Sequence, residues 1–345
     1  LIKAVAGGGG RGIRLANNST ELEDMVSAAR KEAQASFGND EVYLEPLVLG
    51  ARHIEVQIIG DGNGNVICLG ERECSIQRRR QKLIEEAPAS HLPEHLRLAF
   101  QEDALKLARR LNYRGLGTIE FLLDKNGEYF FIEVNPRIQV EHPVTEMVTG
   151  IDLVREQLIL AVTGKLRINQ KGIVIHGSAI EARVLAEDTN NGFLPATGEI
   201  SHLLMPGGMG VRVDTSLYLG MPIDANYDSL LAKVIVWDEN RGRALGRMKR
   251  ALQEFQIGGV PTDLAFLQQI VTSSSFRSGR TDTTYLDHFL PLQGMENELI
   301  EKDLVVAIAL LANQNSSNGV IQEELTDSNS FWKFAAWREQ MGILP

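Results

Sequence analysis

The sequence predicts an α+β protein, and three observations support that prediction. Apolar residues recur with the 3.6-residue period of a helix in a few long segments, such as residues 19–37. Short apolar runs that are separated by Gly, Asp and Asn indicate strands and turns along much of the remaining chain. The chain has 32 glycines against 11 prolines, which favours tight turns inside a folded body over flexible linkers.

The predicted elements alternate along the first half of the chain. Ser19 or Thr20 can cap a helix that extends to Phe37. Further helices are predicted at about residues 93–111 and at 144–162, the second one ended by Gly164. Strands are predicted at residues 1–6, 13–16, 42–49, 54–59 and 66–69, and a hairpin at 117–135.

After Ile173 the pattern changes to short strands, with turns at Pro206-Gly207-Gly208 and at Gly220. A strand at 231–237 precedes a basic helix at about 241–255, and the change in pattern predicts a domain boundary near residues 165–172. Beyond Pro291 the sequence predicts a helix at 298–313, a polar linker at 314–319 and an aromatic stretch at 331–338.

The composition excludes several classes of protein. With 43% hydrophobic and 23% charged residues, the chain is an ordinary globular sequence and not a disordered one. The candidate for a membrane span, Val305 to Ala312, is far shorter than the roughly 20 residues that a span needs. The net charge of −10 argues against nucleic-acid binding. Cys68 and Cys74 match neither a disulfide framework nor a zinc spacing.

A run of glycines follows the first predicted strand. Gly7, Gly9 and Gly12 satisfy the dinucleotide-binding spacing, but no helix begins at this loop and no Gly-Lys-Ser/Thr closes it. Neither a Rossmann nor a Walker loop is therefore expected. A glycine hairpin between Lys3 and Arg11 could wrap a polyphosphate with its backbone amides, and a flexible surface turn remains the alternative.

The predicted hairpin at 117–135 brings two carboxylates together. Asn126-Gly127 is a two-residue turn signal, and the register that it sets places Glu120 directly opposite Glu133. Like charges in that position destabilise a sheet, and a divalent cation between them would remove the conflict. Oxygen ligands favour Mg²⁺ or Mn²⁺. The alternative is that both carboxylates point to solvent on an exposed face.

Polar residues continue beyond the hairpin with the period of a strand. Glu133, Asn135, Arg137, Gln139 and Glu141 alternate with apolar residues, so an extended chain would place all five on one face. Glu133 and Asn135 could share a cation, Arg137 could bind an oxyanion, and Glu141 beside a guanidinium could act as a general base. For Arg137 and Glu141 to act together, the chain must bend after Arg137, around Gln139, or a substrate must bridge the two residues. An amphipathic edge strand is the alternative.

A charged run extends from Glu71 to Lys82. Such runs usually cover a solvated face, and that is the expectation here, although a phosphate site would need extra cations.

Taken together, these stretches resemble biotin carboxylase, the ATP-grasp component of biotin-dependent carboxylases. The resemblance covers about residues 1–290. It is carried by Ile2-Lys3 with Gly7–Gly12, and by residues 52–57, 71–82, 85–88, 131–146, 181–183, 186–188, 193–195, 206–208 and 227–229. It implies an ATP-grasp domain at 1–168, a biotin carboxylase C-terminal domain at 169–290, and a linker with the start of a linking domain at 291–345.

The resemblance implies ATP-dependent carboxylation of biotin by bicarbonate through carboxyphosphate, with Mg²⁺ or Mn²⁺, and a role for each matching residue. Phosphates would be held by Lys3, Gly9 and Gly10, and adenosine by Glu45, Pro46, Leu47, Val48, His53 and Leu122, with Gln77 as a further cofactor-binding residue. The metal ligands would be Glu120, Glu133 and Asn135. Bicarbonate would be positioned by Lys82, Arg137, Gln139 and the amide of Val140, with Glu141 as the base. Arg212 would stabilise the enolate of biotin.

The family also implies partners: a biotin carrier domain or subunit, a carboxyltransferase subunit and a second copy of the chain. His142-Pro143 and the stretch at 331–338 are more similar to acyl-CoA carboxylases than to pyruvate carboxylases. The compartment expected is the cytoplasm, or the mitochondrial matrix in a eukaryote.

The sequence also departs from the family. The N-terminal Rossmann-like domain is missing, so an N-terminal truncation is expected. Arg80 stands where many relatives have His or Asn, which puts that nucleotide contact in doubt, and Asp188-Thr189 replaces Asp-Pro. Two alternatives stay open: another ATP-grasp carboxylate ligase, or a fragment without activity that acts in assembly.

Overall fold

The structure is a computed structural model that describes residues 1–7 and 13–289 of the chain. The predicted helix, linker and aromatic stretch beyond Pro291 lie outside these residues, as do Gly9 and Gly10. Within them the α+β prediction is confirmed, since helices accompany sheets whose strand pairs are antiparallel. None of the helices described has the length and apolar content that a membrane crossing requires.

A sheet of eight strands forms the centre of the described part, in the order β14-β16-β9-β6-β5-β4-β7-β8. In chain order its strands are β4 (Arg52–Asp61), β5 (Val66–Arg78), β6 (Gln81–Ala87), β7 (Arg114–Leu123), β8 (Tyr129–Asn135), β9 (Ser178–Leu185), β14 (Val211–Thr215) and β16 (Leu230–Asp238). Because β6 pairs with β9, one sheet continues across the predicted domain boundary at 168/169, and that boundary stays a prediction.

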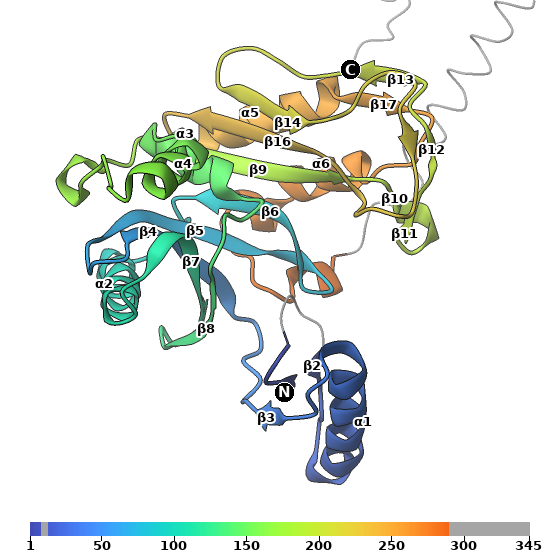
Figure 1. Ribbon diagram of the computed structural model, residues 1–345. Coiled ribbons are helices and arrows are strands. Elements are labelled where there is room, and N and C mark those ends of the chain that lie inside the picture. Colours follow the sequence, from blue (N-terminus) through green and yellow to red (C-terminus); the bar gives the residue numbers. More distant parts are fainter. Residues whose placement is uncertain (8–12, 290–345) are drawn as a thin grey trace, which may run out of the picture. The chain divides into compact units, whose positions relative to one another are not determined.

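Helices cover both faces of this sheet (Figure 1). On one face, α2 (Glu94–Arg110) packs on β4, β5 and β7, while α5 (Arg241–Glu254) and α6 (Leu264–Thr272) pack on β9 and β16. On the other face lie α3 (His142–Thr149) and α4 (Leu153–Thr163). Neighbouring residues in a strand point to opposite faces, so Ile58 belongs to the core under α2 and Ile59 to the core under α4.

The predicted helix at 144–162 is two helices, α3 and α4. Gly150 ends α3 in the left-handed conformation at φ 70°, which glycine adopts without steric cost. Asp152 then caps α4, because its Oδ1 accepts a hydrogen bond from the backbone nitrogen of Arg155 at 2.8 Å. Gly164 ends α4, as predicted.

A separate three-stranded sheet lies at the start of the chain, in the order β2 (Ile13–Arg14), β1 (Ile2–Ala4), β3 (Val42–Leu44), and α1 (Ser19–Phe37) packs on it. The strands before and after the glycine run, β1 and β2, pair antiparallel, so they form the hairpin that was predicted. The N-cap of α1 is Asn18 and not Ser19 or Thr20, because the Asn18 side chain accepts from the Glu21 nitrogen at 2.9 Å.

Short strands fill much of the second half of the chain, as predicted. They are β10 (Glu187–Asp188), β11 (Leu194–Pro195), β12 (Gly198–Glu199), β13 (His202–Leu204), β15 (Pro222–Ile223) and β17 (Gln256–Gly258). They form three two-stranded sheets, and the short helix α7 (Ser274–Arg277) follows α6.

Candidate active site

A row of charged residues crosses four strands of the large sheet. Arg72 on β5 lies opposite Glu55 on β4, Glu55 lies opposite Glu120 on β7, and Glu120 lies opposite Glu133 on β8. Directly opposed residues share a face, so the row is on the α3 and α4 side of the sheet. On β4, His53, Glu55 and Gln57 alternate with Ile54 and Val56, and this pattern turns the polar residues to that side.

The opposition of Glu120 and Glu133 was predicted and is confirmed, but the predicted two-residue turn is wrong. The hairpin loop spans Asp124 to Glu128, where the Asp124 nitrogen donates to the Glu128 oxygen at 2.8 Å and Gly127 adopts φ 86°. Next to this loop the register differs by one residue. Ile132, an extra residue in β8, restores the predicted pairing at Glu133.

Lys82 gathers three carboxylates on this face. Its Nζ lies 2.5 Å from Glu55 Oε2, 3.0 Å from Glu120 Oε1 and 2.6 Å from Glu141 Oε1. Burial alone would lower the pKa of this ammonium group, but Glu55 and the other carboxylates hold it well above its usual value. Burial would likewise raise the pKa of Glu55, yet Arg72 and Lys82 together lower it to about 2. Lys82 is therefore a permanent cation at the centre of the cluster.

Neutral donors and a histidine complete the surroundings of Glu120. Its Oε1 accepts from Asn135 Nδ2 at 3.0 Å and from Gln139 Nε2 at 2.9 Å, and His53 Nε2 lies 3.0 Å from its Oε2. Burial opposes ionisation of Glu120, but His53 and Lys82 outweigh it and depress the pKa. Asn135 Nδ2 also donates to Glu133 Oε1 at 3.2 Å, so one amide bridges the two opposed carboxylates.

This donor set fits a hard divalent cation. Glu120 and Glu133 offer carboxylate oxygens, and rotating the Asn135 amide would replace its NH₂ with Oδ1, which gives the all-oxygen ligands that Mg²⁺ prefers. Glu120 is buried, so the alternative in which both carboxylates point to solvent is wrong.

Arg72 is fully buried, which contradicts the expectation of a solvated face for the run from Glu71 to Lys82. Its guanidinium donates to Glu55 Oε1 at 2.5 Å and to four neutral oxygens, those of Gln57, Thr118, Gln139 and Thr145, at 2.7 to 3.2 Å. On the other face Glu71 pairs with Arg97, and Glu73 pairs with Arg52. The expectation is wrong for Glu71 to Ile76, which lie inside because β5 is a central strand, and each buried charge there has a partner from another element. Arg79 and Arg80, at the turn into β6, are exposed.

The five polar residues from Glu133 to Glu141 do not lie on one extended face, and that prediction is wrong. Strand β8 ends at Asn135, and the chain bends at Arg137 before it enters α3. Gln139 and Glu141 are buried, whereas Arg137 is exposed and donates only weakly, to the Ile138 carbonyl at 3.2 Å and to Asn135 Oδ1 at 3.4 Å. The bend after Asn135 is what brings Glu141 to Lys82.

Three residues of this cluster had no role in the sequence interpretation. Arg183 on β9 lies 2.9 Å from Glu141 Oε2 through Nη2, and its Nε donates to Glu85 Oε1 at 2.7 Å. Glu181 lies opposite Glu85. The signal was present, because Glu181 and Arg183 alternate with buried Ala182 and Val184 as the polar residues of β4 do.

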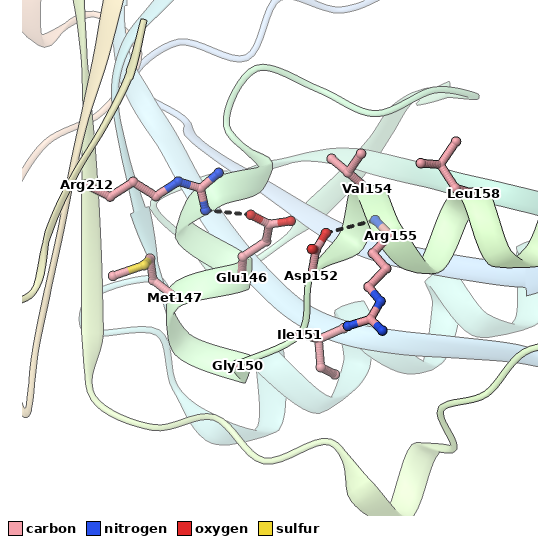
Figure 2. A pocket seen from close by; sticks show the side chains of 9 residues that line it. All are labelled: Glu146, Met147, Gly150, Ile151, Asp152, Val154, Arg155, Leu158 and Arg212. Atoms are coloured by element: carbon pink, nitrogen blue, oxygen red, sulfur yellow. Dashed lines mark hydrogen bonds and ion pairs between the residues drawn. The ribbon is translucent and has the colours of Figure 1, made fainter.

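Arg212 on β14 contacts carboxylates other than Glu141. Its Nε and Nη2 donate to Asp214 at 2.7 and 2.8 Å, and its Nη1 donates to Glu146 Oε2 at 2.7 Å. Arg212 and Glu146, together with Met147 and residues of α4, line an open pocket of about 660 Å³ (Figure 2). Within the described residues, no contact joins Arg212 to Glu141 or Lys82, so the structure does not bring Arg212 together with the candidate base.

The candidate nucleotide residues form two groups. His53 lies opposite Leu122, and its Nδ1 lies 2.6 Å from Gln77 Nε2, so these three residues lie together. Lys3 on β1 forms an ion pair with Glu45, the first residue after β3. Pro46, Leu47 and Val48 follow Glu45 outside any strand. Val140 is half-buried, and its carbonyl accepts from Lys233 Nζ at 2.9 Å.

Known families match most of the chain. Residues 1–169 match the family described as carbamoyl-phosphate synthase L chain, ATP binding domain, and residues 181–288 match the biotin carboxylase C-terminal domain. A biotin carboxylase of Nostoc sp. is 51% identical over 286 residues, which are 83% of this chain and 64% of that protein. The mitochondrial methylcrotonoyl-CoA carboxylase subunit alpha of Dictyostelium discoideum is 40% identical over 334 residues, which are 96% of this chain and 47% of that protein.

Solved structures agree with these matches. The biotin carboxylase domain dimer of Hydrogenobacter thermophilus 2-oxoglutarate carboxylase, in complex with MgADP, ADP and bicarbonate, has a TM-score of 0.80 at 45% identity. The alignment covers 83% of this chain and 63% of the Hydrogenobacter chain. Biotin carboxylase from Campylobacter jejuni has a TM-score of 0.81 at 44% identity, and the alignment covers 84% of this chain and 64% of the Campylobacter chain. This chain thus spans somewhat less than two thirds of the relatives that it matches. It belongs to the biotin carboxylase family and has its ATP-grasp fold and C-terminal domain.

Proposed function

We propose that the protein carries out the ATP-dependent carboxylation of biotin by bicarbonate, through carboxyphosphate. The observation that carries this proposal is Glu141, a buried carboxylate held between Lys82 and Arg183 at 2.6 and 2.9 Å. The two permanent cations attract a small anion to this place, which brings the proton of that anion within reach of the carboxylate. The similar Hydrogenobacter domain, solved with MgADP and bicarbonate, supports the same substrates here.

Glu120, Glu133 and Asn135 would hold Mg²⁺ or Mn²⁺, which when bound neutralises charge on the nucleotide phosphates. Without the ion, Asn135 Nδ2 bridges the two carboxylates, and Lys82 donates to Glu120. Lys3, with Gly9 and Gly10 after it, would hold phosphates, and Lys3 would leave Glu45 to do so. His53, Leu122 and Gln77, together with the segment Glu45 to Val48, would line the adenosine site.

In the chemical step Glu141 takes the proton of bicarbonate on one of its carboxylate oxygens. The bicarbonate oxygen then attacks the γ-phosphate, and ADP leaves. Lys82, the Val140 amide, Gln139 and Arg137 would position the anion. Arg137 is free to turn toward it because only two long hydrogen bonds hold its guanidinium.

Arg212 would stabilise the enolate of biotin, as the resemblance implies. It lines an open pocket with Glu146, and its partner Asp214 lies 3.5 Å from Lys233, which donates to the Val140 carbonyl beside the base. Arg212 and Arg183 each pair with two carboxylates, and Arg212 is the more exposed of the two.

We further propose that the protein serves an acyl-CoA carboxylase, with a biotin carrier and a carboxyltransferase as partners and a homodimer or larger assembly as its state. The Dictyostelium methylcrotonoyl-CoA carboxylase subunit, which aligns with 96% of this chain, supports this choice. Pyruvate carboxylase of Bacillus subtilis matches 83% of the chain and is the alternative. The compartment is proposed as the cytoplasm, or the mitochondrial matrix in a eukaryote.

Steady-state ADP release by the whole protein tests the activity, measured with Mg²⁺ and with or without bicarbonate and biotin. We expect release to depend on both. ATP hydrolysis that ignores bicarbonate and biotin would contradict the proposal and favour another ATP-grasp ligase. No hydrolysis at all under any condition would favour a role in assembly alone. Glu239→Gln, which changes an exposed carboxylate paired only with Arg243, is the matched control.

A further inference from the structure

A second pair of opposed carboxylates lies in the same sheet. Glu85 on β6 and Glu181 on β9 are directly opposite each other in the antiparallel pairing, so both point to the face that carries Glu141. Both side chains have 0% exposure. Neither has a part in the reaction steps above.

Hydrogen-bond partners for this pair are scarce. Glu85 Oε1 accepts from Arg183 Nε at 2.7 Å. Among the described residues, Glu85 Oε2 and both carboxylate oxygens of Glu181 have no hydrogen-bond partner. A buried carboxylate without donors loses its hydration and gains nothing in return, and the like charge opposite adds repulsion. Two ionised groups are not sustainable in this arrangement.

The surrounding cations are already engaged. Arg183, on the same strand as Glu181, is shared by Glu85 and Glu141. Lys82 contacts Glu55, Glu120 and Glu141. Lys233 on β16 donates to the Val140 carbonyl at 2.9 Å and lies 3.5 Å from Asp214. None of these three contacts Glu181.

The acidities agree with this geometry. Burial, with Glu85 adding to it, raises the pKa of Glu181 well above its usual value. Burial also raises the pKa of Glu85, to about 7, although Arg183 opposes the shift.

We propose that the Glu85/Glu181 pair holds one proton in the resting site, carried by Glu181, and that Glu85 is a positioning residue which shares Arg183 with Glu141. The neutral Glu181 leaves Glu85 as the charged member of the pair, and Glu85 orients the Arg183 guanidinium together with Glu141. Through that guanidinium, Glu85 limits how strongly Arg183 stabilises the carboxylate form of Glu141. The second half of the proposal rests on the proposed function, because it takes Glu141 as the base.

The position of the proton is tested by protein stability alone. Glu181 has a raised pKa in the folded state, so the unfolded chain releases this proton first as pH rises. Above the ordinary pKa of about 4.5, this one group therefore lowers the stability of the wild type as pH rises. Glu181→Gln removes this loss. We expect its melting temperature relative to wild type to increase steadily between pH 5 and pH 8. If the melting temperature of Glu181→Gln relative to wild type falls over this range, Glu181 is ionised and its charge is balanced by a partner. That result would overturn the first half of the proposal, the proton on Glu181.

Asp263→Asn is a matched control for the loss of a buried carboxyl. Asp263 is also buried, its Oδ2 has no partner among the described residues, and its Oδ1 accepts from the Leu185 nitrogen. Burial raises its pKa well above the usual value. It should therefore show the same trend in stability with pH as Glu181→Gln.

The positioning role is tested by the pH profile of bicarbonate-dependent ADP release in Glu85→Gln. Arg183 is then left to Glu141 alone, so we expect the acid limb to move to lower pH. We also expect kcat to fall about tenfold, which is less than the roughly 10²- to 10⁴-fold that loss of a general acid or base itself costs, with the KM for ATP almost unchanged. A purely structural role of Glu85 would lower activity equally at every pH and leave the acid limb of the profile in place. That result would overturn the second half of the proposal, the positioning role. Asp263→Asn should leave the limb in place. If the wild type shows no response to bicarbonate, the proposed function and this second half fail, while the stability profile still decides where the proton lies.

Discussion

Two pairs of glutamates face each other across neighbouring strands of one sheet, yet their surroundings favour opposite charge states. Glu120, opposite Glu133, has a depressed pKa because His53 and Lys82 outweigh the effect of burial. Glu181, opposite Glu85, has a raised pKa because burial and its neighbour act in the same direction. The backbone register, which creates the repulsion, is equivalent in the two pairs.

The difference lies in the donors that come from outside each pair. Lys82, Asn135 and Gln139 all donate to Glu120 Oε1, and they come from three separate segments. Around Glu85 and Glu181, Arg183 is the one donor among the described residues, and Glu141 shares it. A pair of opposed carboxylates thus becomes a candidate cation site only where other segments supply donors that a metal ion can replace.

The largest effect is expected for Glu141→Gln, which removes the carboxylate that connects the two regions through Lys82 and Arg183. Loss of a general base should lower bicarbonate-dependent turnover on the order of 10²-fold or more, while nucleotide affinity stays nearly the same. Turnover and nucleotide titrations on the same preparation measure both. Near-normal turnover would mean that the base lies elsewhere.

Arg72→Met should have the largest effect on stability, because it leaves Glu55 in the core with Lys82 but without Arg72, two cations that each lie 2.5 Å from it. Removing one partner of a buried ion pair costs about 3–5 kcal/mol, which urea unfolding would detect. Adding Glu55→Gln to Arg72→Met should recover part of that loss. Arg243→Met, at an exposed pair, is the control and should cost little. If Arg72→Met and Arg243→Met lower the free energy of unfolding equally, the charges do not stabilise the buried network.

Glu133→Gln removes one member of the donor-rich pair and sharpens its contrast with the other pair. The variant should need a higher Mg²⁺ concentration for turnover, whereas its melting temperature without metal should hold or rise because the repulsion is relieved. Glu254→Gln, on the exposed face of α5, is the control. A large loss of thermal stability without metal would show that the pair serves structure and not a cation.

A smaller effect is expected at the hairpin that leads to Lys82. Arg79 and Arg80 both adopt positive φ, 50° and 67°, which side-chain-bearing residues seldom do. Replacing them together, by Arg79→Asn and Arg80→Gly, should stabilise the fold by about 1 kcal/mol, because Asn-Gly suits such a turn. Thermal unfolding measures the gain, and a loss of stability would show that the arginines make contacts that compensate for the backbone.

The sequence reveals the first pair and not the second for a physical reason. Glu120 and Glu133 lie on one hairpin, where the register follows from nearby residues, whereas Glu85 and Glu181 come from strands that are far apart in the chain. The sequence predicts a solvated face for the charged run around Arg72, because a local pattern does not distinguish a central strand from an edge strand. It also predicts a polar face that continues past Asn135, because alternation alone does not show where a strand stops pairing.

Infrared spectroscopy of the carboxyl groups tests the central contrast most directly. A protonated, buried carboxyl group absorbs apart from ionised carboxylates, so spectra of the wild type, Glu181→Gln and Glu120→Gln at neutral pH report each state. The account predicts that Glu181→Gln loses one band of protonated carboxyl groups and that Glu120→Gln loses none. An unchanged band in Glu181→Gln, or a lost band in Glu120→Gln, would contradict it.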